Sequence, residues 1–256
     1  MEVSRIALAL RPRNPWEAID LGFLLARENL GPVYRAWVAT AVPVALAVNL
    51  LLLDQLWLAS LILWWLKPAF DRVVLAVLSR SVFGERSTLR ETLAALPGLL
   101  LHSGLAAGLL WRRLSLARSF LLPVWQLEGL GGAARRARSR LIEKQARNPA
   151  VWLTVACIHI EAAVFLSVLG FLVLMLPDTL EVNIRELFFR EQAPLWFAVL
   201  TNVLQFLSVT VVEPFYVAGG FALYLNRRSA LEAWDVEIAF RRLAEEAPKR
   251  AQRRAA

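Results

Sequence analysis

The stretch that decides the fold is AVWLTVACIHIEAAVFLSVLGFLVLML, residues 150–176, in which Glu161 is the only charged side chain. About 20 consecutive apolar residues are enough for an α-helix to cross the hydrocarbon core of a bilayer, which is roughly 30 Å thick. A membrane strand would alternate apolar and polar side chains, and this run does not. The sequence therefore predicts a transmembrane α-helix here.

Five further apolar runs predict spans, which we expect at 36–53, 56–78, 93–110, 114–130 and 194–225. The run 114–130 is short and carries Arg118 and Glu128, so hydropathy alone leaves it open. Over the whole chain 58% of the 256 residues are hydrophobic and the mean hydropathy is +0.51, whereas soluble domains are about 45–50% apolar. We expect an all-α fold, a polytopic membrane helix bundle of about six transmembrane helices.

Loop charge predicts the orientation, because Lys and Arg near span ends collect on the cytoplasmic side. With six crossings and the N-terminus inside, 22 of the 29 basic residues fall in inner segments and four in outer ones. Both termini are therefore expected in the cytoplasm. If 93–110 and 114–130 instead form a re-entrant pair, the number of crossings is four, and both termini are still on the same side. Six crossings, and four crossings plus that pair, therefore both stay open.

Several classes of function are excluded by composition. The net charge of +8 comes from the inner segments, and no interleaving of aromatic and basic residues is visible, so nucleic acid is not an expected partner. One Cys excludes an intramolecular disulfide, and with two His it gives too few ligands for an ordinary structural zinc site. No Gly-rich phosphate loop, HExxH, GxSxG or CxxC motif occurs. We expect no cofactor and no enzymatic activity.

Residues 1–35 are expected to form a cytoplasmic segment with an interfacial helix. Asn14-Pro15 is a strong helix start, since Asn caps well and Pro suits the first helical position, and Gly31-Pro32 is expected to end this helix. A helix packed on the bundle is the alternative. Asn148-Pro149 repeats the start signal before the span 150–176. Two capping boxes are expected further along, at Thr88-x-x-Glu91 and Ser229-x-x-Glu232.

Residues 226–256 are expected to form a cytoplasmic helix, from Ser229 to about Ala247, followed by a basic tail. At 100° per residue the apolar side chains of this helix fall on two nearly opposite sides. One side holds Leu231, Trp234 and Ile238, and the other holds Val236, Phe240 and Leu243. A helix resting on one surface needs a single apolar stripe. We interpret these residues as a partner-docking helix, with packing between cytoplasmic helices of the same chain as the alternative.

Ionisable side chains inside spans are costly and mark either a function or a specific buried pair. The candidate intramembrane polar site consists of Glu161, Glu213, His159, His102 and Arg118. Two carboxylates and two histidines at bilayer depth are typical of a proton or cation path. A Glu–Arg pair of structural purpose, or contact with water, would explain the same residues.

Other charges near the spans have local interpretations. Lys67 and Asp71 are four residues apart and are expected to neutralise each other along one helix. Arg72 is expected to extend toward the cytoplasm. Glu128 is expected to contact the basic segment 131–148 that follows it. Cys157 lies in an apolar run, which favours core packing over nucleophilic chemistry.

Several stretches together resemble a known family: LKPAFDRVVLAVLSRSVFGE followed by STLRETL, LLPVWQLEGLGGAARRARSRL, and PFYVAGGFALYLNRRSALEAWDVEIAFRRL. The chain resembles six-span bacterial membrane proteins similar to the membrane domain of some glycerophosphodiester phosphodiesterases. It is more similar to uncharacterised proteobacterial inner-membrane proteins encoded beside a MoxR-type AAA+ ATPase. The resemblance implies a bacterial inner-membrane accessory component acting with an AAA+ ATPase. It implies no lipid hydrolysis, because the phosphodiesterase's metal-binding His and Glu cluster has no counterpart.

The leading hypothesis from the sequence is a non-enzymatic multi-pass protein, an accessory or scaffold component that docks cytoplasmic partners of an envelope-associated complex. The alternative is a small carrier or lipid flippase that uses Glu161, Glu213 and His159. A lipid-active enzyme ranks third. The sequence leaves the substrate, the partner and the oligomeric state open.

Overall fold

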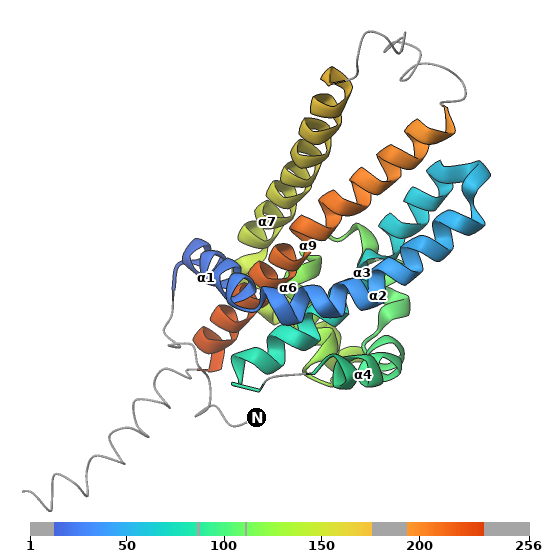
Figure 1. Ribbon diagram of the computed structural model, residues 1–256. Helices are drawn as coiled ribbons and strands as arrows, with labels where there is room; N and C mark the ends of the chain where they lie inside the picture. Colours follow the sequence, from blue (N-terminus) through green and yellow to red (C-terminus); the bar gives the residue numbers. More distant parts are fainter. Residues whose placement is uncertain (1–12, 86–87, 111, 176–193, 233–256) are drawn as a thin grey trace, which may run out of the picture.

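A computed structural model describes residues 13–85, 88–110, 112–175 and 194–232 (Figure 1). These residues form eight α-helices and two short 3-10 helices, and they contain no strand. The predicted all-α class is therefore confirmed for the part of the chain that the structure describes. Within that part, three helices are long and apolar enough to cross a membrane, which indicates a membrane protein.

The helix predicted after Asn14 is α1, Pro15–Glu28, and the Asn14 side chain accepts a hydrogen bond from the Trp16 amide as a cap. This helix ends at Asn29, two residues before the predicted stop. The Asn29 amide bonds to the carbonyls of Ala26 and Leu25. The next helix, α2 (Leu30–Leu51), begins at once and includes Pro32 in its first turn, where the missing N–H would have had no helical partner anyway.

Helices α2 and α3 form an antiparallel hairpin joined by the short 3-10 helix η2, Leu53–Gln55 (Figure 1). α3 spans Leu56–Val82 and is about 40 Å long at 1.5 Å per residue. It is long enough to cross a bilayer, yet it is not among the three spans identified from length and composition, which are α2, α7 and α9. Lys67, Asp71 and Arg72 lie in its middle and lower its hydropathy.

The predicted helix over 93–110 is wrong, because the chain breaks there. α4 (Leu89–His102) begins with the predicted capping box of Thr88 and Glu91, which is confirmed, and a short α5 (Leu105–Leu109) follows the break. Gly104 between them has a φ of +68°, a left-handed conformation that glycine adopts without steric cost. A Cβ at Gly104 would also lie 2.4 Å from the Trp125 ring. Backbone conformation and packing both require glycine at this turn.

The region predicted as the span 114–130 holds the 3-10 helix η3 (Arg112–Leu114) and α6 (Arg118–Gln126). α6 has nine residues and is about 14 Å long, so it is too short to cross the hydrocarbon core alone. The six continuous spans expected from the sequence are therefore not found among the described residues.

The two longest helices pass through residues where the sequence predicted new helix starts. α7 runs from Gly132 to Leu174 and continues through Pro149. α9 runs from Leu195 to Glu232 and continues through Ser229, whose side chain is buried rather than capping. A proline inside a helix removes one hydrogen bond and crowds the preceding turn, at a cost of about 3 kcal/mol. Packing of α7 along α9 and α6 offsets this cost at Pro149.

Two predicted domain boundaries consequently fall inside helices. The boundary at 35/36 lies within α2, and the boundary at 225/226 lies within α9. The basic segment 131–148, predicted as a loop, is mostly the first part of α7. α7 has 43 residues and is about 64 Å long, roughly twice the thickness of a hydrocarbon core.

α9 lies at the centre of the bundle and packs against α1, α3, α6 and α7 (Figure 1). Small residues allow the closest approaches. A Cβ at Gly22 of α1 would lie 2.5 Å from the Ala218 carbonyl oxygen, and a Cβ at Gly220 would lie 2.5 Å from the Ser119 backbone of α6. Close helix packing through small residues is typical of membrane helix bundles.

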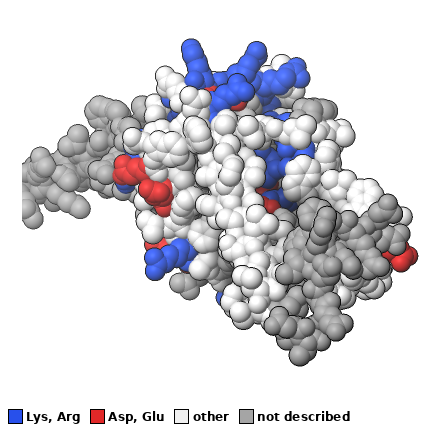
Figure 2. Space-filling view, turned by 90° about the horizontal axis from the view of Figure 1, so that it is seen from above, with Lys and Arg blue, Asp and Glu red and all other residues white. Residues whose placement is uncertain are grey.

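Toward the ends joined by residues 176–193, α7 and α9 share a separate small apolar cluster formed by Leu169, Phe197 and Leu204. α7 also exposes large apolar side chains there, among them Leu166 and Phe171. Figure 2 shows a broad surface without charged residues and a group of Lys and Arg side chains at one edge of the molecule. Such an apolar surface on long helices is what a protein surrounded by lipid exposes.

Candidate functional site

Three helices each direct one stripe of residues toward a common interior region. The spacing is three or four residues, except for a step of eight, about two helical turns, between Gln205 and Glu213, so each stripe follows one side of its helix. The stripes are Ser60, Trp64, Lys67 and Asp71 on α3; Thr154, Cys157 and Glu161 on α7; and Asn202, Gln205, Glu213 and Tyr216 on α9. Polar side chains that are far apart in the sequence therefore come together.

Five of the charged side chains form one connected set, which we call the buried network. Lys67 Nζ lies 2.8 Å from a Glu161 oxygen and 2.7 Å from a Glu213 oxygen. Arg118, at the start of α6, lies 2.9 Å from Glu213 and 3.1 Å from Asp71. The exposed fraction of these five side chains is between 0 and 12%. Each carboxylate therefore has a cationic partner in a region that water barely reaches.

The structure brings together three of the residues predicted for the intramembrane polar site, namely Glu161, Glu213 and Arg118. His159 is not among them, because its ring is exposed on α7 and its Nδ1 lies 2.7 Å from the Val155 carbonyl oxygen. The side chain of His102 lies outside the described residues. Glu161, Glu213 and Arg118 therefore meet as part of the buried network, together with Lys67 and Asp71, whereas His159 does not join them.

Two local predictions on α3 are also wrong. Lys67 and Asp71 do not neutralise each other, because Lys67 pairs with α7 and α9 whereas Asp71 pairs with Arg118. Arg72 does not extend to the cytoplasm. Its side chain is buried and donates to Ser103 Oγ at 2.5 Å and to the Ser103 carbonyl at 3.3 Å. It thereby satisfies the backbone at the break between α4 and α5.

Hydrogen bonds connect the segment 112–117 and the first turn of α6 to α3, α7 and α9. Arg113 donates to the Trp64 carbonyl at 2.6 Å, and Thr154 Oγ1 donates to the Leu116 carbonyl at 2.5 Å. The Ser119 amide donates to the Tyr216 hydroxyl at 3.3 Å. Buried irregular backbone needs protein groups to satisfy it, and the Thr154 hydroxyl does so for the Leu116 carbonyl.

A cavity of about 160 Å³ adjoins the buried network. Its walls include Lys67, Arg113, Arg118, Glu161 and Glu213, together with Thr154, Cys157 and Tyr216. Its rim is apolar and exposed, since Leu114, Leu116 and Ile158 keep 73%, 45% and 53% of their surface accessible. The cavity thus opens sideways, between the segment before α6 and the outer face of α7.

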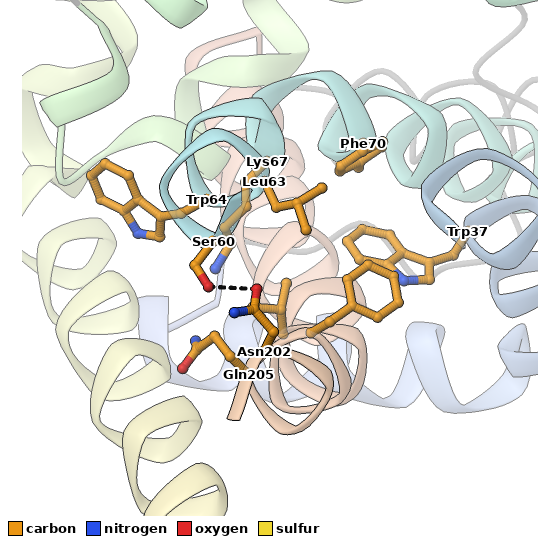
Figure 3. A pocket seen from close by; sticks show the side chains of 10 residues that line it. Trp37, Ser60, Leu63, Trp64, Lys67, Phe70, Asn202 and Gln205 are labelled. Atoms are coloured by element: carbon orange, nitrogen blue, oxygen red, sulfur yellow. Dashed lines mark hydrogen bonds between the residues drawn. The ribbon is translucent and has the colours of Figure 1, made fainter. Parts of the chain in front are cut away.

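A second, smaller pocket lies between α2, α3 and α9 and shares Trp64 and Lys67 with the first (Figure 3). Its volume is about 30 Å³, which is enough to hold a water molecule. Figure 3 shows the Ser60 hydroxyl directed at Asn202, to which it donates at 2.7 Å. Gln205, on the same wall, donates to Glu161 at 2.9 Å. Polar groups therefore continue from the buried network toward the α2–α3 turn.

A second ion network ties three elements together near the C-terminal end of α9, and we call it the rim network. Arg138 of α7 lies 2.9 Å from Glu128 and also contacts Glu232, which pairs with Arg228 at 2.9 Å. The Tyr224 hydroxyl donates to Glu128 at 2.7 Å. The predicted contact of Glu128 with the following basic segment is confirmed.

The predicted docking helix is described only at its beginning. Leu231 continues α9 and packs against the main core as a partly buried side chain. The other five predicted docking residues lie outside the described residues, namely Trp234, Val236, Ile238, Phe240 and Leu243. The two-sided apolar pattern that motivated a docked partner thus stays a prediction.

The sequence interpretation missed several residues of the site, namely Ser60, Arg113, Thr154, Asn202, Gln205 and Tyr216. A signal existed for part of them, because polar residues recur at helical spacing within apolar runs, as at Asn202, Gln205 and Glu213. Arg113 carried no such signal, since it was assigned to an outer loop.

No group of three or more His, Cys, Asp or Glu side chains in the described parts of the chain is placed to hold a metal ion. Comparison with known proteins adds no assignment: no family model, no curated protein and no solved structure matches this chain.

Proposed function

We propose that this protein is a multi-pass membrane carrier, a lipid flippase in which the cavity beside the buried network receives a polar lipid headgroup. The proposed topology has four crossings, α2, α3, α7 and α9, with the segment from α5 to α6 entering and leaving on the cytoplasmic side. Both termini then lie in the cytoplasm of a bacterial inner membrane. The close contacts of Gly104 with Trp125 and Arg135, and of Arg113 with α3, support such a path into the bundle and back.

The observation that carries the proposal is the shape of the cavity. Its inner wall is charged and its rim is apolar and open to the side. A lipid combines the same two properties in one molecule, because its headgroup is polar and its chains are apolar. A headgroup entering past Leu114 and Ile158 would reach Lys67 and Glu161, while the acyl chains would stay on the exposed apolar face of α7.

The chemistry of the site is exchange of partners rather than bond breaking. Glu161 accepts hydrogen bonds from Lys67 and from Gln205. A headgroup with both acceptor and donor groups can accept those two bonds and donate one of its own to Glu161. Ion pairs away from water are strong only while both partners are present. A ligand that supplies replacement partners can therefore occupy the cavity without leaving an isolated charge.

The test is transbilayer movement of a fluorescent phospholipid in liposomes that contain the purified full-length protein. Dithionite added outside bleaches the lipid that has reached the outer leaflet. Glu161→Gln should slow the movement at least about tenfold, since one lost charge-assisted interaction is worth roughly 1.5–3 kcal/mol. Glu143→Gln is the matched control, because Glu143 lies on the same helix but pairs with Arg147 outside the cavity. Equal rates for wild type, Glu161→Gln and protein-free liposomes would rule out the proposal.

A second function, docking of a cytoplasmic partner, is supported by the first part of α7. Arg136, Arg140, Lys144 and Arg147 are all exposed there, and their spacing places them along one face. We retain the proposal that this basic face and the segment 226–256 dock a partner, with an AAA+ ATPase as the candidate implied by the family resemblance.

Docking is tested by cross-linking and co-purification from native membranes. Full-length protein is compared with a 233–256 deletion, which leaves α9 as described intact and is matched for expression and insertion, and with a variant in which Arg136, Arg140 and Lys144 are replaced by Gln. A defined partner should be lost from both variants. Retention of every co-purifying protein in both would discard the docking proposal.

A further inference from the structure

We infer that the cavity binds a singly charged anionic group, of which a phosphodiester is the membrane's commonest form, and that Arg113 is the residue that binds it. This inference rests on the proposed lipid-binding function and specifies the chemistry of the headgroup. It is carried by the charge balance around the cavity and by the position of Arg113.

The charges around the cavity do not cancel. Three basic side chains line the cavity, Lys67, Arg113 and Arg118, but only two carboxylates do, Glu161 and Glu213. Asp71 and Arg72, which carry opposite charges, lie outside this lining. With every group in its ordinary charge state, the set carries one excess positive charge. An uncompensated charge away from water is costly, and one monoanion would neutralise it.

Arg113 is the member of this set that is both unpaired and placed in the cavity wall. Its side chain is buried with 6% of its surface exposed, and no carboxylate of the described residues lies within the 4.0 Å of an ion pair. One amino group donates to the Trp64 carbonyl, and the guanidinium carbon lies 3.7 Å from the Trp64 ring centre. Its Nε is buried and has no hydrogen-bond partner among the described residues.

The other unpaired arginine does not compete for this role. Arg72 does not line the cavity, and its donors already reach the Pro68 carbonyl and Ser103. Arg113 thus leaves a free donor beside Arg118 and Lys67, which line the same cavity. A guanidinium presents donors in a fixed fork that matches the oxygens of a phosphate. Glu161 and Glu213 line the same cavity and can accept hydrogen bonds from donor groups of the same headgroup.

The experiment measures binding to full-length protein in neutral detergent by native mass spectrometry. Phosphatidylglycerol is compared with a diacylglycerol of the same chains, which lacks the phosphate. Wild type should bind phosphatidylglycerol at least about tenfold more tightly. Arg113→Gln should remove that preference, and Arg113→Lys should keep part of it. Arg112→Gln is the matched control, because Arg112 lies 4.1 Å from the Trp125 ring and does not line the cavity.

Protection of Cys157 gives a second readout that does not depend on a variant. Cys157 is the only cysteine of the chain and lines the cavity, so a bound ligand should slow its alkylation by N-ethylmaleimide. Slower alkylation with phosphatidylglycerol but not with diacylglycerol supports the inference. Protection by inorganic phosphate alone, lost in Arg113→Gln, supports the anion site and contradicts the lipid carrier.

Two results would overturn the inference. One is equal affinity for the two lipids in wild type, which would leave a neutral amphiphile as the ligand and the carrier proposal intact. The other is the same loss of binding in Arg112→Gln as in Arg113→Gln, which would assign the effect to general positive charge.

Discussion

The buried network and the rim network are built from the same kinds of side chain but differ in their surroundings. In the buried network the exposed fraction of the side chains does not exceed 12%, and Glu213 keeps only 2%. In the rim network Glu232 keeps 28%, Arg228 keeps 21% and Arg138 keeps 19%, and only Glu128, with 8%, is as buried as the other network. Water can therefore replace a lost partner at the rim, but it cannot do so at the buried network.

This difference teaches how the two networks can contribute. Exposed ion pairs contribute about 0–1 kcal/mol. Removing one partner of a buried pair costs about 3–5 kcal/mol because a charge is left without compensation. The stability of a protein with five such charges in its interior depends on all of them together. A charged ligand can bind beside them only if it leaves each buried charge with a partner.

The largest effect is expected for Glu213→Gln. Glu213 pairs with both Lys67 and Arg118, so the substitution leaves two buried cations short of a partner. The free energy of unfolding should fall by about 3–5 kcal/mol. Titration of the solubilised protein with sodium dodecyl sulfate, followed by tryptophan fluorescence, measures it. Glu143→Gln is the control, because Glu143 belongs to a more exposed ion pair. If Glu213→Gln lowered the free energy of unfolding no more than the control does, buried and exposed ion pairs would not differ in energy here.

An intermediate effect is expected for Gly220→Ala. Gly220 packs on Ser119, the residue after Arg118, and a Cβ there would lie 2.5 Å from the Ser119 backbone. Overpacking of this kind costs about 1–3 kcal/mol, and it should move Arg118 away from Glu213. The same unfolding titration measures the loss. Gly170→Ala on α7 is the control, since nothing lies within 4 Å of a Cβ there and alanine favours the helix.

The smallest effect is expected for Glu232→Gln in the rim network. Because this pair is partly exposed, the loss should be about 0–1 kcal/mol at low salt. It should shrink further at 1 M salt, where the screening length falls to about 3 Å. The comparison is made with Glu213→Gln at both salt concentrations. A salt-independent loss as large as that of Glu213→Gln would mean that the two networks do not differ in exposure to water.

Prediction from the sequence succeeded where a local pattern was sufficient. The cap at Asn14 and the capping box at Thr88 depend on residues within one turn, and both are confirmed. It failed where helix ends depend on packing. Pro149 and Ser229 look like start signals in isolation, but long helices continue through them because neighbouring helices stabilise the backbone.

For the candidate site, the sequence identified the costly residues but not their partners. Glu161, Glu213 and Arg118 are conspicuous because ionisable groups are rare in apolar runs. Lys67 was assigned to Asp71 because the two are four residues apart, although its side chain meets carboxylates from two other helices. The partner of a buried charge is set by which helix faces meet, and sequence spacing on one helix contains no information about that.

The sequence by itself determined that the chain is helical and that it contains apolar runs long enough to cross a bilayer. Hydropathy and run length are properties of consecutive residues. Only the tertiary structure decided that Gly104 breaks one of these runs, that α6 is too short to cross, and that Arg113 lies in a cavity wall. Such features depend on contacts between residues far apart in the chain, and the cost of burying a charge is fixed by the partners that these contacts supply.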